Sequence, residues 1–356
     1  MVRFVANVDP AALDDALAGL EPASTLVVVA SKTFTTQETM ANASAARRWL
    51  TDSLGEEAVA KHMVAATANA AEAARFGIPE CNVLPFGNWV GGRFSVWSSV
   101  GIPVAIALGM PAFDRFLAGA HAVDLVFRSA SPERNVPLLL ALAGLWNRNF
   151  LDISVHAVLP YAQRLASLPA YLQQLEMESN GKRVSPAGEP VAHATCPAIF
   201  GEAGTLGQHA FYQWLHQGTE EASSDFIVVA RPMGSRESDH AALLANALAQ
   251  SEALMTGRST DNPHRDCPGN RPSTTIVLPS LEPAAIGALV ALYEHKAYTQ
   301  AVLWGVNAFD QFGVELGKAI AGRILPAIAG EPGTLHPATG HLLGVIRKAA
   351  QGGQAR

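Results

Sequence analysis

The chain has 356 residues, of which 49% are hydrophobic and 16% charged, so it is long enough for two domains and too apolar to be disordered. Its net charge of −6 and the lack of any Lys/Arg run argue against nucleic-acid binding, so an anionic substrate needs a local positive pocket. The three cysteines are scattered and no ligand spacing is present, which argues against a disulfide framework and a metal site. No signal peptide or membrane-spanning run is visible, and we expect a cytoplasmic protein without membrane contact.

In chain order, short β-branched or apolar runs alternate with helical patterns. Strands are predicted at 2–8, 25–30, 62–67, 82–85, 155–159, 226–230 and 275–279, and helices at 11–20, 36–54 and, in an apolar region, 112–150. Segments 185–190 and 259–272 are predicted loops. This alternation predicts an α/β protein with two doubly wound, mostly parallel sheets. We expect a first domain at 1–115, a second at 116–308, and a C-terminal helix and arm at 309–356.

A run of hydroxyl residues, SKTFTTQET at 31–39, follows an apolar strand directly and opens a helix. Thr35 and Glu38 have the spacing of a capping box. Hydroxyls and free N–H groups at a helix N-terminus, with Lys32 beside them, form a cradle for an anion. The end of a strand is also where α/β sheets bind ligands. For a single Ser/Thr cluster, however, a plain capped helix is the better interpretation.

The block FGNWVGGRFSVWSSVG at 86–101 places Arg93 among aromatic residues. Gly91 and Gly92 before it allow the backbone to approach a ligand closely. A structural arginine in a turn and a ligand-binding arginine fit these residues equally well.

Gln174 and Glu178 lie four residues apart in QQLEMESNGK at 173–182, on a predicted helix that Asn180 and Gly181 end. A carboxylate near a helix end is usually solvated. A general base needs instead a desolvated or hydrogen-bonded position that adjusts its pKa.

A glycine-rich loop in GEAGTLGQHAFYQWLHQGT at 201–219 brings His209 to the head of a predicted helix, seven residues before His216. The spacing allows both imidazoles to face the same way. A lone histidine in such a place is more often structural than catalytic.

The C-terminal block YEHKAYTQAVLWGVNAFDQFGVELGK at 293–318 predicts a helix that begins near 307–310. Gln311, Glu315 and Lys318 would then share one helical face. Three apolar neighbours are expected to point into a core: Phe309, Phe312 and Leu316. Periodicity alone favours a solvated polar stripe over the wall of a polar site.

Together these five blocks resemble the glucose-6-phosphate isomerase family over nearly the whole chain, from FVANVD at 4–9 to residues 341–348. The resemblance implies two sugar-isomerase (SIS-type) domains. It also implies the glycolytic and gluconeogenic interconversion of glucose 6-phosphate and fructose 6-phosphate, without a metal or redox cofactor. Some members of the family also accept mannose 6-phosphate. Two departures, Ala203 for proline and Leu206 for asparagine, replace no catalytic group.

The resemblance also implies a role for each matched residue. Glu178 is the base that moves a proton between C2 and C1 through a cis-enediol(ate), and Arg93 stabilises the charge that develops. His209, supplied by the other subunit of a homodimer, opens the sugar ring with Lys318. The implied substrate ligands are Ser31, Lys32, Thr33 and Thr36 for the phosphate, with Gly92, Gln174 and Gln311 as further contacts.

Members of this family carry a glycine-rich GIGGS-type phosphate loop just before the FVANVD-like strand, whereas here Met1 lies at that strand. We therefore expect the first domain to lack its opening strand, loop and helix. The alternative function is a catalytically impaired fragment that binds sugar phosphate or dimerises. A sugar-phosphate-sensing regulatory domain is less favoured, because the sequence has no helix-turn-helix candidate or basic patch.

Overall fold

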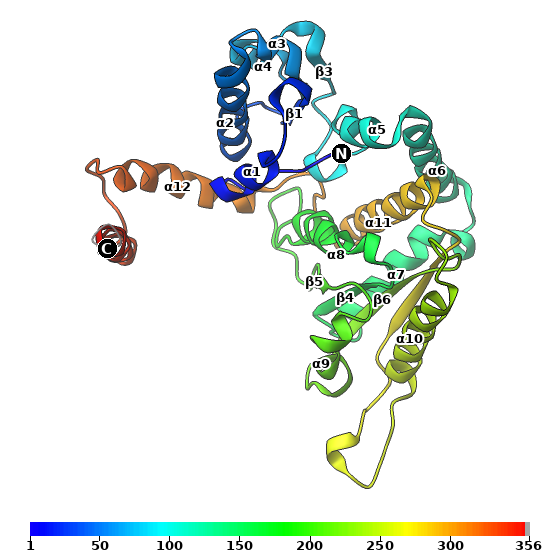
Figure 1. Ribbon diagram of the computed structural model, residues 1–356. Helices are drawn as coiled ribbons and strands as arrows, with labels where there is room; N and C mark the ends of the chain where they lie inside the picture. The colour runs from blue at the N-terminus through cyan, green and yellow to red at the C-terminus, as the bar shows by residue number, and fades with distance from the viewer. Residues whose placement is uncertain (353–356) are drawn as a thin grey trace. The chain divides into compact units, whose positions relative to one another are not determined.

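The chain divides into two compact units, Met1–Ala308 and Phe309–Arg356, and the computed structural model describes residues 1–352 (Figure 1). The first unit holds a three-stranded and a four-stranded sheet, and every strand pair in both is parallel. The α/β class is therefore confirmed.

The first sheet has the order β1-β2-β3, with strands Val27–Ala30, Met63–Thr67 and Val83–Pro85. Register pairs Val28 with Val64, and Ala65 with Val83. The accompanying helices are α2 (Gln37–Leu54), α3 (Ala58–His62) and α4 (Ala70–Phe76). Buried apolar side chains such as Leu50 form the core between sheet and helices. The predicted strands are confirmed, with ends shifted by a residue or two.

The strand predicted at 2–8 is wrong, because residues 1–9 are irregular and the first helix, α1, spans Pro10–Leu17. A strand needs a neighbouring ladder, and among residues 1–352 no strand pairs with this segment. Phe4 is 77% exposed. Arg3 donates instead to carbonyls at the end of α1, including that of Ala18 at 2.9 Å. Asp9 caps the start of α1 by accepting from the Ala11 N–H.

The second sheet has the order β5-β4-β6-β7, with strands Ala198–Gly201, Val155–Pro160, Ala222–Val229 and Ser273–Leu278. The chain leaves β4 toward β5 and leaves β6 toward β7, so the sheet is doubly wound, with a switch point between its two central strands. β5 was not predicted, because four residues give too short a pattern. β6 begins at Ala222, earlier than predicted, because its polar residues Ser223 and Asp225 are buried in hydrogen bonds.

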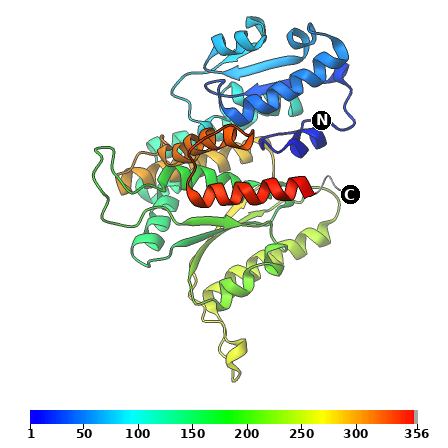
Figure 2. The ribbon, with the colours of Figure 1, turned by 90° about the vertical axis from the view of Figure 1, so that its left-hand side faces the viewer.

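The remaining helices of the first unit pack on the second sheet or on the helices that cover it (Figures 1 and 2). They are α5 (Ile102–Leu108), α6 (Met110–Ser129), α7 (Val136–Asn149), α8 (Leu168–Leu172), α9 (Tyr212–Gln217), α10 (Glu237–Thr256) and α11 (Pro283–Trp304). The predicted helical region at 112–150 is confirmed as α6 and α7. α11 is mostly apolar, has no distinct polar face and is buried along much of its length. It crosses α6 so closely that a Cβ on Gly287 would lie 1.9 Å from the Phe116 carbonyl oxygen.

The segment from 257 to 272 extends beyond α10 and β7, and an isolated bridge between Arg258 and Cys267 closes its base (Figure 2). This agrees with the predicted loop at 259–272. Within residues 1–352, no helix combines the length and apolarity needed to cross a bilayer.

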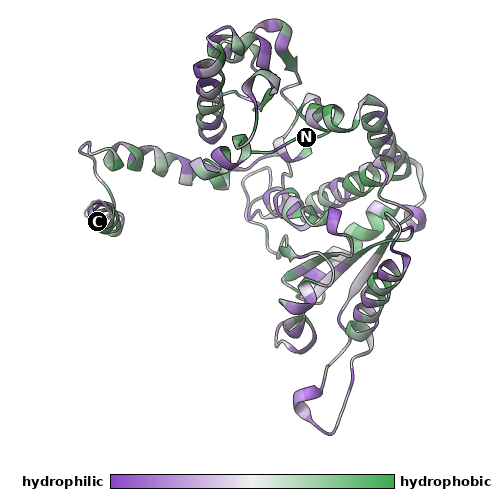
Figure 3. Cartoon of the chain, in the orientation of Figure 1, coloured by the Kyte–Doolittle hydropathy of each residue, from purple (hydrophilic) through white to green (hydrophobic). Residues whose placement is uncertain are grey.

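The second unit contains α12 (Glu315–Ile328) and α13 (Pro337–Gly352), and polar and apolar residues alternate around α12 (Figure 3). The helix predicted near 307–310 begins only at Glu315, after a 3₁₀ turn. Gln311 has a φ of −152° and lies outside the helix, so it does not share a face with Lys318. The expected burial of three apolar side chains is also wrong: the exposed fractions are 59% for Phe309, 71% for Phe312 and 69% for Leu316.

Candidate active site

The centre of the candidate site is an ion pair between Arg93 and Glu178. Arg93 lies in a 3₁₀ turn, Gly92–Phe94, and its side chain is 3% exposed. Nη1 lies 3.1 Å from Glu178 Oε2, and Nε donates to Ser179 Oγ at 2.7 Å. The guanidinium also donates to the carbonyl of Ala308. The arginine therefore fixes the carboxylate by a charge-assisted contact and ties together three segments that are distant in sequence.

The segment that presents Glu178 is a π-helical stretch, Gln173–Glu178, directly after α8. Such wide turns occur frequently at functional sites, because they rotate side chains off the regular α-helical positions. Here Leu175 and Glu176 are buried, whereas Gln174 is exposed and Glu178 is partly exposed, with 22% of its side chain accessible. The sequence predicted an ordinary α-helix with four-residue spacing, and the wider turn is a correction.

The end of this segment is fixed by Gly181 and Lys182. A Cβ on residue 181 would lie 2.4 Å from the Met177 carbonyl oxygen, so only glycine fits there. The Lys182 ammonium donates to the carbonyls of Glu178 and Ser179, each at 2.9 Å, and to that of Asn307 at 3.0 Å. A cation among the last carbonyls of a helix compensates their partial negative charge.

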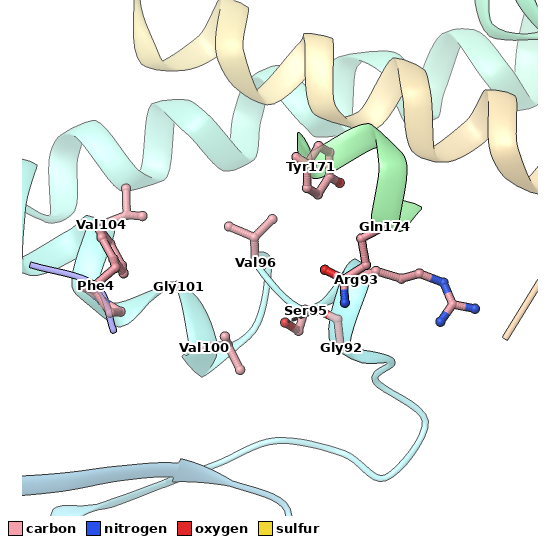
Figure 4. Close-up of a pocket in the computed structure, with 11 residues that line it drawn as sticks. Phe4, Gly92, Arg93, Ser95, Val96, Val100, Gly101, Val104, Tyr171 and Gln174 are labelled. Atoms are coloured by element: carbon pink, nitrogen blue, oxygen red, sulfur yellow. Dashed lines mark hydrogen bonds between the residues drawn. The ribbon is translucent and has the colours of Figure 1, made fainter. Parts of the chain in front are cut away.

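A cavity adjoins Arg93 and Gln174 (Figure 4). Gly92, Arg93, Gln174 and Tyr171 line one part of it. The remaining lining residues are mostly apolar: Phe4, Ser95, Val96, Val100, Gly101, Pro103 and Val104. The Arg93 guanidinium points away from the apolar end that Phe4 and Val104 form (Figure 4). The polar part therefore carries a cation and an amide side by side.

Buried charged side chains lie within and next to the π-helical stretch. Glu176 is fully buried and accepts from the Lys296 ammonium of α11. Nearby, Asp225 of β6 accepts from the Tyr293 hydroxyl at 2.9 Å and lies 3.2 Å from His156 Nε2, an ion-pair contact rather than a well-aligned hydrogen bond. Burial alone would raise the pKa of Asp225, but His156, Lys296 and Tyr293 outweigh burial and hold this pKa below its usual value.

The hydroxyl run at 31–36 forms a separate cluster at the carboxyl end of β1. Ser31 is buried; its Oγ accepts from the Phe34 N–H at 3.1 Å and lies 3.3 Å from Thr36 Oγ1. Lys32 and Thr33 are exposed. Thr36 is the N-cap of α2, and its side chain makes no capping bond. This leaves hydroxyls, a lysine and a helix N-terminus together, as an anion cradle requires.

The predicted capping box of Thr35 and Glu38 is wrong, because Thr36 occupies the N-cap position. The Thr35 hydroxyl donates instead to Thr33 Oγ1 at 2.8 Å.

His209 lies in a 3₁₀ turn, Gly207–His209, and its side chain is exposed. It precedes α9, which begins at Tyr212. His209 and His216 therefore do not lie on one helix, and the prediction that they do is wrong. The neighbouring Gln208 donates to Tyr161 OH at 2.9 Å, which fixes the turn beside β4.

The structure thus brings together Gly92, Arg93, Gln174 and Glu178. The hydroxyl run at 31–36 and His209 also belong to the first unit, whereas Gln311 and Lys318 belong to the second. Sequence reasoning missed the supporting residues Glu176, Ser179, Lys182 and Lys296. Glu176, Ser179 and Lys182 lie within four residues of Glu178, and that proximity is the only sequence signal for them. Among residues 1–352, no cluster of three or more His, Cys, Asp or Glu side chains is placed to hold a metal ion.

The fold thus defines a parallel α/β protein in which a carboxylate, an arginine and an amide lie together, groups of the kind that acid–base chemistry uses. Comparison with known proteins identifies the family. The family model described as Phosphoglucose isomerase matches residues 1–339, so the chain belongs to that family.

Curated relatives agree. The chain is 52% identical to glucose-6-phosphate isomerase of Frankia casuarinae, over 96% of the chain, and 51% identical to that of Brucella ovis, over 93%. In both comparisons the chain spans 64% of the relative's length.

Solved structures are also similar. A glucose-6-phosphate isomerase from Chlamydia trachomatis superposes with a TM-score of 0.86 at 38% identity, covering 97% of this chain and 67% of that one. A hypothetical protein from Thermus thermophilus gives a TM-score of 0.75 at 28% identity, covering 91% of this chain and 77% of that one.

Proposed function

We propose that this chain carries the acid–base machinery for the reversible conversion of glucose 6-phosphate to fructose 6-phosphate. The observation that supports this most directly is the Glu178 carboxylate, held 3.1 Å from the buried Arg93 guanidinium beside Gln174. The curated relatives named above carry the name of this activity.

In the proposed mechanism, Glu178 removes the proton from C2 of the open-chain aldose, and the electron pair forms the C1–C2 double bond of a cis-enediol(ate). The same carboxyl group returns the proton to C1, while a hydroxyl proton moves from O2 to O1. C2 is oxidised and C1 is reduced, so the redox change stays within the substrate. In this mechanism the Arg93 cation stabilises the negative charge that develops on the substrate oxygens.

The remaining roles are proposed from the resemblance of the matched blocks. His209 and Lys318 open the sugar ring before the proton transfer. The cradle of Ser31, Lys32, Thr33 and Thr36 holds the phosphate at the N-terminus of α2. The further substrate contacts are Gly92, Gln174 and Gln311. We propose a homodimer in which His209 serves the site of the partner subunit.

A coupled assay of fructose 6-phosphate formation tests the proposal. Glu178→Gln removes the base but keeps the size of the side chain, and general acid–base catalysis contributes roughly 10²–10⁴-fold, so we expect a kcat loss of that order. Glu189→Gln, in an exposed loop, is the matched control and is expected to retain full activity. No turnover by the wild-type chain, or unchanged turnover in Glu178→Gln, would contradict the proposal.

One observation supports a second candidate. The hydroxyl cluster of Ser31 and Thr36 and the Arg93–Glu178 pair share no residue. A chain that binds sugar phosphate or dimerises without full catalysis needs only one of the two groups. Calorimetric titration with glucose 6-phosphate distinguishes the two candidates: binding without turnover favours the second, and turnover excludes it.

A further inference from the structure

A partly buried carboxylate connects the two segments that carry the residues of the candidate site. Glu294 of α11 accepts from Trp97 Nε1 through Oε2 at 2.8 Å and from the Tyr171 hydroxyl through Oε1 at 3.4 Å. Trp97 follows Arg93 in the segment at 86–101. Tyr171 belongs to α8, which leads directly into the π-helical stretch with Gln174 and Glu178.

The two donors are themselves held in place. Trp97 stacks on Phe116 of α6, with ring centroids 4.8 Å apart. Tyr171 lines the same cavity as Arg93 and Gln174. The site segments are therefore joined at Arg93, which contacts Glu178 and Ser179, and again through Glu294. The contacts through Glu294 lie on other residues of both segments, so they restrict the relative orientation of the segments further than Arg93 does alone.

We propose that Glu294 is a positioning residue, which sets the orientation of Arg93 relative to Glu178 through its hydrogen bonds to Trp97 and Tyr171. This inference rests on the proposed function, because it assigns Glu294 to the same site. Tyr171 lines the cavity and Glu294 does not. Glu294 therefore acts on the site through Trp97 and Tyr171, the two side chains that donate to it.

The bridge should respond to pH near neutrality. Burial raises the pKa of Glu294 to about 7, although the hydrogen bonds from Trp97 and Tyr171 act in the opposite direction. Two other ionisable groups face this region, Asp124 of α6 and the adjacent His295, and they pair with each other at 2.7 Å. Asp124 raises the pKa of Glu294 further. A protonated Glu294 has one O–H donor and less acceptor capacity than the carboxylate, so protonation weakens or rearranges the two bonds.

Four variants test the bridge. Trp97→Phe and Tyr171→Phe each remove one donor but keep the ring, and Glu294→Gln removes the charge. Trp304→Phe is the matched control, because it loses a similar indole bond, to Asn149 at 2.7 Å, on the same helix but outside the site. One hydrogen bond corresponds to about a fivefold change in rate, so we expect kcat to fall roughly five- to tenfold in the first three variants, with KM little changed. Trp304→Phe should keep the wild-type kcat.

A second readout is independent of turnover. Tryptophan fluorescence of the wild-type chain should show a transition near pH 7 that is absent from Trp97→Phe and Glu294→Gln and present in Trp304→Phe. An inactive wild-type chain that shows this transition would contradict the isomerase proposal and keep the bridge. The inference is overturned if the transition survives in Trp97→Phe, or if an active enzyme keeps its kcat in both Trp97→Phe and Tyr171→Phe.

Discussion

At the scale of single residues, Arg93 has more contacts than a substrate cation needs. It binds Glu178, Ser179 and the Ala308 carbonyl while 3% of its side chain is exposed. Each contact uses a different edge of the planar guanidinium. Arg93 is thus a candidate both for stabilising the intermediate and for holding the base that forms it.

Arg93→Lys should therefore not be conservative. A lysine ammonium cannot reach three acceptors in these directions, so at least one buried acceptor loses its donor at a cost of about 1–3 kcal/mol. We expect a lower free energy of unfolding in urea and a kcat reduced by at least roughly tenfold. Arg148→Lys, at an arginine outside the site, is the control. Equal effects of the two substitutions would contradict the assignment.

Glu294 also predicts how stability depends on pH. Its pKa in the folded chain, about 7, lies above the ordinary value of 4.5, so the folded state holds this proton more tightly than the unfolded state. Its contribution to the free energy of unfolding is therefore fully present below about pH 4.5 and is lost as pH rises through about 7. Asp225, whose pKa is lowered, acts in the opposite sense and loses its contribution in acid.

Urea unfolding between about pH 4 and 8 measures the Glu294 effect. In Glu294→Gln the decrease of stability with rising pH should be smaller than in the wild-type chain, whereas Glu189→Gln should leave the slope unchanged. Identical slopes for Glu294→Gln and the wild type would show that the carboxyl does not titrate as inferred.

At the scale of elements, the π-helical stretch depends on α11. Glu176 pairs with Lys296, and the Asn180 side-chain amide donates to the Ala297 carbonyl at 3.0 Å. These contacts lie on either side of Glu178 in sequence. The wide turn is therefore attached to α11 before and after Glu178, which limits how far this side chain can move.

Lys296→Met should be strongly destabilising, because it leaves the Glu176 carboxylate buried without its cation. Removing one partner of a buried ion pair costs about 3–5 kcal/mol. The double variant Glu176→Leu with Lys296→Met should recover most of that loss, since an apolar pair of similar size needs no counterion. A double-mutant cycle in urea measures the coupling, and additive single and double effects would rule the pairing out.

At the scale of the whole molecule, the proposed residues are spread over two sheets and two units. Arg93 and Glu178 meet within the first unit, whereas Lys318 and Gln311 belong to the second. His209 is exposed on a turn before α9. The family resemblance places His209 in the site of a second subunit, and that arrangement has a direct test.

Mixing two inactive variants provides the test. Glu178→Gln and His209→Asn are each expected to be inactive as homodimers. If Glu178 and His209 of one site come from different subunits, each mixed dimer contains one intact site, and random exchange restores about a quarter of wild-type activity. The measurement is the coupled assay after co-refolding, with Glu189→Gln mixed into Glu178→Gln as the control for refolding. If co-refolded Glu178→Gln and His209→Asn stay inactive while that control regains activity, both residues belong to one subunit.

Alternating apolar strands and helical patterns in the sequence were sufficient to predict a parallel α/β protein, because burial on both faces of a sheet leaves a local signature. The resemblance of five blocks was sufficient for the family. Local patterns failed where the outcome depends on a partner distant in the chain: residues 2–8 form no strand, and the helix expected near 307 begins at Glu315. Only the tertiary structure decided which side chains meet. Arg93 with Glu178, Glu176 with Lys296, and Glu294 with Trp97 and Tyr171 are pairs across folded segments, and periodicity carries no information about them.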